Sequence, residues 1–105
     1  MDINPSLLVK IKNSIRITHN KLDEDVNDTI AAALADLKVC GIRPEKLNPS
    51  QELAPLILTA VKLYCKKEYV DDPAKAARFQ EGYDSLKACL MMSEGYGGEG
   101  AGSDE

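Results

Sequence analysis

The segment at residues 54–69, APLILTAVKLYCKKEY, places the strongest constraint on how this chain can fold. Its apolar side chains recur at helical spacing, which predicts an amphipathic helix. One face of that helix carries Leu53, Ile57, Ala60, Val61, Tyr64 and Cys65. Leu56, Leu58 and Leu63 fall outside this face, so the helix is apolar around most of its circumference. Such a helix is normally buried on several sides, and a chain of 105 residues has little mass with which to bury it.

Two helices are predicted before this segment. Asn4 and Pro5 are typical of a helix start, and the apolar spacing that follows predicts a helix over about residues 5–16. Asp23 opens an acidic first turn, which suits the positive end of a helix dipole. An alanine-rich run then predicts a second helix over residues 23–39, and Gly41 is a natural stop.

One helix is predicted after it. Asp72 and Pro73 are typical of an N-cap and a first helical position, which predicts a helix over residues 73–92. Its expected apolar face carries Ala76, Phe79, Tyr83, Leu86, Cys89 and Leu90. We expect Phe79, Tyr64 and Tyr83 to form the aromatic part of the core.

The remaining segments are predicted to be irregular. Residues 42–52 contain Pro44 and Pro49 and have the composition of a loop. From residue 93 the sequence SEGYGGEGAGSDE is rich in glycine and acid, which predicts a disordered tail with Tyr96 as its one obvious anchor. The predicted fold class is all-α: a compact bundle of four helices in a single domain, residues 1–92, followed by a disordered acidic tail, residues 93–105.

Charge and hydropathy limit the partners. The formal net charge is −4, but the last thirteen residues hold four acidic and no basic side chains, so residues 1–92 are neutral. A strongly basic nucleic-acid-binding surface is therefore not expected. A local basic patch around Lys62, Lys66 and Lys67 and a solvated helix face are both compatible with the sequence, and the solvated face is favoured. No apolar run reaches the roughly 18 residues that span a bilayer, and we expect neither a membrane partner nor a signal peptide.

No chemistry of catalysis or ligand binding is predicted, whether catalytic residues, a cofactor site or a metal site. Cys40, Cys65 and Cys89 lack paired spacing, and we expect three reduced core residues. His19 is the one histidine and has no second ligand or orienting group at a useful spacing. The acidic cluster that begins at Asp23 lacks EF-hand spacing.

Two segments resemble the head–tail connector proteins of tailed bacteriophages, a family also described as head-completion or DNA-packaging proteins. Residues 15–26, IRITHNKLDEDV, are similar to the family's opening, and the alanine-rich run up to Gly41 follows as it does there. The second segment is similar to the family's third and fourth helices and the short Asp-Pro hinge between them. It consists of Pro55-Leu56-Ile57 through Tyr64-Cys65-Lys66, then Asp72-Pro73, Arg78-Phe79, Tyr83, Ser85-Leu86-Lys87 and Leu90. The likeness covers roughly residues 7–93, while the loop at 43–52 and the tail depart from it.

The resemblance implies a structural virion protein, not an enzyme. Such proteins form a ring of about a dozen subunits below the portal, complete the DNA-filled head and provide the platform for the tail or stopper. The implied partners are other copies of the chain, the portal protein and a stopper or tail-completion protein. DNA would pass through the ring without sequence-specific binding. Assembly would take place in the host cytoplasm, and the final location would be the head–tail interface of the virion.

Candidate subunit contacts are Leu56, Leu58 and Leu63, or the outer face of the fourth helix. An excess of apolar surface on a small domain suits an obligate interface, which is similar to a domain core cut in half. The alternative is a small helical DNA-binding or protein-binding module that uses the second and third helices as a helix-turn-helix. About ten residues separate Gly41 from Leu53, however, and the usual turn has 3–4 residues.

Overall fold

The computed structural model describes residues 3–17 and 21–93, and its regular structure there is entirely helical. The α-helices are α1 (Pro5–Ser14), α2 (Asp23–Val39), α3 (Pro55–Tyr69) and α4 (Pro73–Met92), and a short 3-10 helix, η1 (Pro44–Lys46), lies between α2 and α3. The predicted all-α fold with four helices is confirmed. His19, Tyr96 and the acidic tail from residue 94 onward lie outside the described residues.

Side-chain caps fix two helix starts. The Asn4 Oδ1 atom accepts a hydrogen bond of 2.8 Å from the Ser6 backbone N–H at the start of α1. The Asp72 Oδ1 atom accepts one of 2.9 Å from Ala74 at the start of α4, as predicted. Each cap satisfies a backbone donor that has no partner within the helix.

Helices α1 and α2 end in the same way, with one residue of left-handed backbone. At the end of α2 this residue is Gly41 (φ 105°), and Ile42 N–H reaches back to Leu37 O at 3.1 Å. At the end of α1 it is Arg16 (φ 63°), and Ile17 N–H reaches back to Lys12 O at 2.9 Å. This bond pattern closes a helix at a left-handed residue. Helix α1 therefore ends at Ser14, two residues before its predicted limit.

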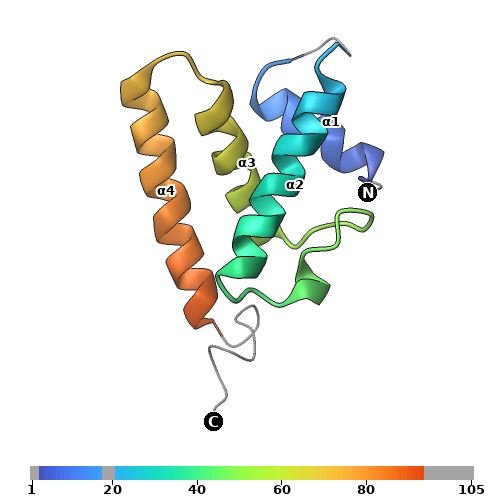
Figure 1. The fold of residues 1–105 in the computed structure, drawn as a ribbon, viewed down its shortest axis with the longest axis vertical. Coiled ribbons are helices and arrows are strands. Elements are labelled where there is room, and N and C mark those ends of the chain that lie inside the picture. The colour runs from blue at the N-terminus through green and yellow to red at the C-terminus, as the bar shows by residue number, and fades with distance from the viewer. Residues whose placement is uncertain (1–2, 18–20, 94–105) are drawn as a thin grey trace.

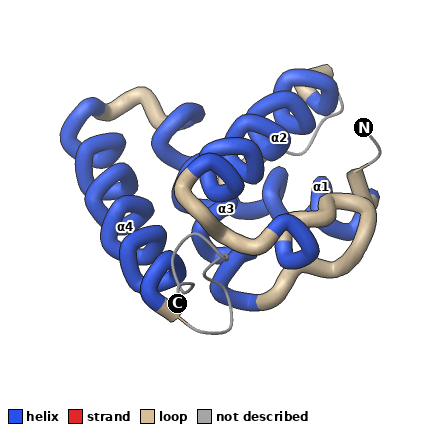
Figure 2. The backbone as a smooth tube through the Cα atoms, turned by 60° about the horizontal axis from the view of Figure 1, so that its bottom comes forward, coloured by secondary structure: helices blue, strands red, loops and turns tan. Residues whose placement is uncertain are grey.

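Helix α3 lies at the centre of the fold and packs against α1, α2 and α4. Figure 1 shows α4 at one edge of the molecule, antiparallel to α3, with α2 and α1 on the other side of α3. Figure 2, turned by 60°, also places α4 at the edge. Helix α4 packs mainly against α3, so much of its circumference stays exposed to solvent.

The hydrophobic core fills the space between α1, α2 and α3. The loop before α3 contributes Ile42, Leu47 and Leu53, while α4 contributes Tyr83 and Leu90. The buried hydrophobic residues that form this core are Leu7, Ile11, Val26, Ile30, Ala33, Leu34, Leu37, Ile42, Leu47, Leu53, Ile57, Ala60, Val61, Cys65, Tyr83 and Leu90. The predicted inner face of α3 is therefore confirmed for Ile57, Ala60, Val61 and Cys65, whereas Tyr64 is half-buried and the buried Leu53 lies in the loop before the helix.

Two expectations about the core are wrong. The ring of Tyr83 packs edge-on against Tyr64 with ring centres 5.4 Å apart, but Phe79 stays half-buried outside the core. Helix α3 faces Phe79 with the lysine Lys66, whose Nζ atom lies 5.7 Å from the ring centre. Among the cysteines Cys65 is buried, whereas Cys89 is exposed because its side of α4 faces solvent.

Candidate interaction surfaces

The three leucines proposed from the sequence as subunit contacts have different surroundings. Leu56, in the first turn of α3, is 46% exposed. Leu58 is half-buried and packs against the core beside Leu53. Leu63 is also half-buried, and its methyl groups face Gly82 across the contact with α4. Leu56 is therefore the residue of the three whose side chain is most available to another molecule.

Three other large apolar side chains of the described residues are more than half exposed. They are Val9 on α1, Val39 at the end of α2 and Met92 at the end of α4. Val39 and Met92 are 85% and 86% exposed, which leaves almost their whole side chains in contact with solvent. Single exposed apolar side chains are common on protein surfaces and do not by themselves mark an interface.

A polar cluster connects α4 to α2. Asp36 Oδ2 accepts hydrogen bonds from the Tyr83 hydroxyl at 2.6 Å and from Lys87 Nζ at 3.1 Å. The hydrogen bond from Tyr83 is the main reason that the pKa of Asp36 lies below its ordinary value. Burial and then this same bond raise the pKa of Tyr83, so the phenol stays protonated. The cluster holds the outer helix in place and has a structural role.

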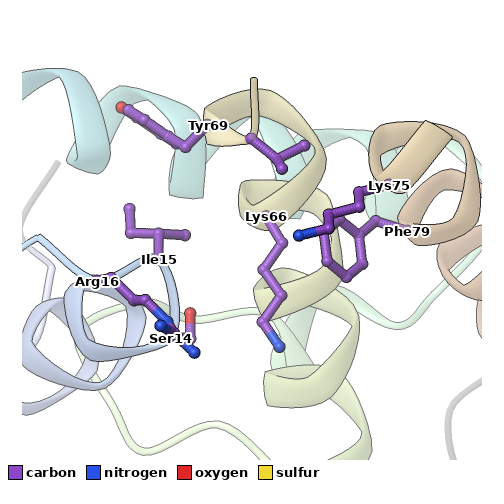
Figure 3. A pocket seen from close by; sticks show the side chains of 8 residues that line it. Ser14, Ile15, Arg16, Lys66, Tyr69, Lys75 and Phe79 are labelled. Atoms are coloured by element: carbon purple, nitrogen blue, oxygen red, sulfur yellow. The ribbon is translucent and has the colours of Figure 1, made fainter. Parts of the chain in front are cut away.

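A second polar feature is an open hollow where the end of α1 meets α3 and α4. Figure 3 shows its lining, and the cavity has a volume of about 410 Å³. Three cationic side chains surround it: Arg16 after α1, Lys66 on α3 and Lys75 on α4. The remaining lining residues are Ser14, Ile15, Tyr69, Val70 and Phe79, so no carboxylate of the described chain lines it. We call this feature the basic hollow.

The sequence left open a basic patch around Lys62, Lys66 and Lys67 but favoured a solvated helix face for these lysines. Lys62, Lys66 and Lys67 are neighbours along α3, but Lys67 pairs with Glu68 at 2.6 Å and lies over the Tyr64 ring at 4.0 Å. Lys66 instead faces the basic hollow together with Lys75, at the start of the next helix, and Arg16, which is far from it in sequence. No local sequence pattern connects these three residues. The left-handed backbone of Arg16 sets its side chain apart, but this can be recognised only once the end of α1 is known.

Neither a membrane span nor a metal cluster is found in the described part of the chain. No helix there has the length and hydropathy needed to cross a membrane. Over residues 3–17 and 21–93, no group of three or more histidine, cysteine, aspartate and glutamate side chains is arranged to hold a metal ion.

The helical arrangement can be compared with known proteins. Residues 7–97 match the family model described as phage connector protein, which covers every described helix except the first two residues of α1. No curated protein and no solved structure gives a significant match. Phage connector proteins are structural components of the virion, and the family is not one of enzymes. The match extends over most of the chain, so the chain belongs to the phage connector protein family.

Proposed function

We propose that this chain is one subunit of a connector ring that assembles below the portal and completes the DNA-filled head. The ring provides the platform to which the tail or stopper protein attaches. The observation that carries the proposal is the family match over residues 7–97. The proposed partners are other copies of the chain, the portal protein and a stopper or tail-completion protein. Assembly takes place in the host cytoplasm.

The position of α4 supports a role in assembly. Only two residues of this 20-residue helix, Tyr83 and Leu90, are buried, so most of its surface remains available for a contact outside the subunit. Its exposed side leaves room for a neighbouring helix in a cyclic assembly, in which each subunit repeats the same pair of contact surfaces. The residues of the connector domain, 1–92, supply these surfaces, and the acidic tail follows the domain.

Leu56, Leu58 and Leu63 are the proposed contacts on α3. Leu56 makes the direct contact, because it is exposed while lying in the central helix. Leu58 lies at the rim of the core, near Lys10 and Glu52. Leu63 acts by setting the position of α4 through its contact with Gly82. Burying one leucine side chain at an interface contributes roughly 1.5–3 kcal/mol, and a ring repeats this gain at every contact.

The charge of the chain supports passage of DNA through the ring. Residues 1–92 carry 13 basic and 13 acidic side chains, so the body is neutral. A basic channel would bind DNA phosphates by releasing counterions and would hold the DNA in place. A neutral body with an acidic tail lets DNA pass without sequence-specific binding.

Substitution of the exposed leucine tests the proposed contact. Leu56→Glu places a charge where a neighbouring subunit packs, and we expect it to abolish assembly of the ring on the portal, measured as the number of copies that co-sediment with each portal. Val39→Glu is the matched control, because Val39 is an even more exposed apolar side chain on another helix. Circular dichroism must show unchanged helicity for both variants. Wild-type levels of portal binding by the folded Leu56→Glu protein would exclude Leu56 from the interface.

A further inference from the structure

We propose that the basic hollow binds the acidic segment around Tyr96 of a second copy of this chain. The proposal rests on the proposed ring, because it identifies the occupant of one surface of each subunit as the tail of a neighbour. The hollow is formed by the end of α1 together with two consecutive helices, α3 and the first turns of α4.

The charges of the hollow favour an anionic partner. Arg16, Lys66 and Lys75 come from different elements and line one cavity (Figure 3), and none of the described carboxylates lines it. Arg16 also occupies a left-handed backbone position, which is usually glycine at a helix end. Helix α2 has glycine, Gly41, at the equivalent position. Arginine is less favourable than glycine at such a position, and we attribute its presence to a role of its charge in binding an anionic partner.

The walls of the hollow favour a partner with an aromatic side chain. Tyr69, Phe79 and Ile15 provide aromatic and aliphatic surface beside the cations. Ligand sites commonly combine apolar walls with a few polar groups in cavities of roughly 300–1,000 Å³, and this cavity of about 410 Å³ falls within that range. A phosphate group would use the cations but not the aromatic walls, so a peptide with acidic and aromatic residues suits the site better than a DNA backbone.

The chain itself contains such a segment. Residues 93–105, SEGYGGEGAGSDE, have four acidic side chains and no basic ones. Tyr96 stands between Glu94 and Glu99, so a carboxylate lies within three residues of the ring on either side. The tyrosine ring would lie against Phe79 and Tyr69, and the carboxylates would face the surrounding cations.

The length of the chain disfavours Tyr96 of the same copy. Lys75 precedes Met92 by seventeen residues of continuous helix, which is about 25 Å along the axis at the helical rise. Figure 1 shows the α3–α4 connection and the end of α4 at opposite ends of that helix. Tyr96 follows Met92 by four residues, which span at most about 14 Å when extended. Phe79, the hollow residue nearest the end of α4, precedes Met92 by thirteen residues, which is about 20 Å. Even this residue lies beyond the reach of the extended backbone, so we assign the Tyr96 that occupies a hollow to another copy.

A peptide-binding assay tests the proposal without a ring or a portal. A fluorescein-labelled peptide of residues 93–105 is titrated with the full-length protein, and its anisotropy is measured at low and moderate salt. We expect saturable binding that weakens as salt rises. Replacing Tyr96 by alanine in the peptide should weaken binding roughly threefold or more, since the aromatic contacts are lost.

Variants of the hollow provide the decisive comparison. Arg16→Gly, Lys66→Gln and Lys75→Gln should each weaken peptide binding roughly two- to fivefold, and the triple variant at least about tenfold. Arg16→Gly keeps a residue that tolerates the left-handed backbone, so the helix end is preserved. Lys62→Gln is the matched control, because Lys62 also lies on α3 but does not line the hollow.

Two results would overturn the proposal. One is peptide affinity that does not change in the triple variant. The other is binding of a short DNA duplex that depends on the same three cations while the peptide does not bind. Since the assay requires no assembly, its failure would leave the proposed ring, which is measured with the portal, as a separate question.

Discussion

The hydroxyl group of Tyr83 on α4 donates a hydrogen bond of 2.6 Å to Asp36 Oδ2 on α2. The same carboxylate oxygen accepts a bond of 3.1 Å from Lys87 Nζ, one turn further along α4. Helix α4 packs mainly against α3, so this cluster is a polar connection between the outer helix and α2. The position of α4 therefore depends on both its packing against α3 and this cluster.

Removal of the Tyr83 hydroxyl should destabilise the fold without changing its shape. Tyr83→Phe keeps the edge-on ring contact with Tyr64 but removes a hydrogen bond to a charged group. Bonds of that kind contribute about 1.5–3 kcal/mol, so we expect the free energy of unfolding, measured in urea, to fall by about that amount. Asp84→Asn on the exposed side of α4 is the control and should change it by less than about 0.5 kcal/mol.

Acid should weaken the same connection. The hydrogen bond from Tyr83 holds the pKa of Asp36 below 3.8, its ordinary value. A carboxylate whose pKa is lower in the folded state than in the unfolded state stabilises the fold at pH values above its unfolded-state pKa. This stabilisation is lost as the pH falls through its folded-state pKa. We therefore expect the wild-type protein to lose stability below about pH 4 through this residue. Urea titrations of Asp36→Asn between pH 7 and pH 2.5 should lack that part of the loss.

The two described glycines should respond in opposite ways to alanine. A Cβ atom at Gly82 would lie 3.6 Å from the methyl groups of Leu63, an ordinary contact, and alanine favours a helix interior over glycine by up to about 1 kcal/mol. Gly82→Ala should raise the melting temperature. Gly41→Ala should lower it, because the left-handed backbone (φ 105°) costs a residue with a Cβ roughly 1–2 kcal/mol. Thermal melts of the two variants check both signs.

The three thiols should react in the order of their exposure. Cys89 is exposed, Cys40 is half-buried and Cys65 is fully buried. Burial raises the pKa of the Cys65 thiol to about 12, so little thiolate is present at neutral pH. A chromogenic disulfide reagent should modify Cys89 first and reach Cys65 only when the protein unfolds. Loss of the fast phase in Cys89→Ser would confirm the assignment.

The local parts of the fold were predictable from sequence because their signals act over a few residues. Asn4, Gly41 and Asp72 fixed helix ends through short-range hydrogen bonds or a left-handed backbone, and the structure places them where the sequence did. The inner face of α3 followed from apolar spacing for the same reason. The predicted end of α1 was two residues too late because Arg16 occupies the left-handed position after the helix, where a glycine would have marked the end in the sequence.

The surface features were less predictable because they depend on which helices become neighbours. Phe79 has the sequence pattern of a core residue, but α3 presents Lys66 rather than an apolar side chain opposite it. The basic hollow joins Arg16, Lys66 and Lys75, which share no spacing in the chain. The exposure of Leu56, and the engagement of Leu63 with α4, likewise depend on the tertiary packing.

Electron microscopy of the protein mixed with its portal tests the central claim most directly. The account predicts a closed ring of additional density below the portal, with one copy of the chain in each repeating unit and an open channel for DNA. A portal that remains bare at saturating concentrations of folded protein would contradict the account, and so would binding as scattered single copies.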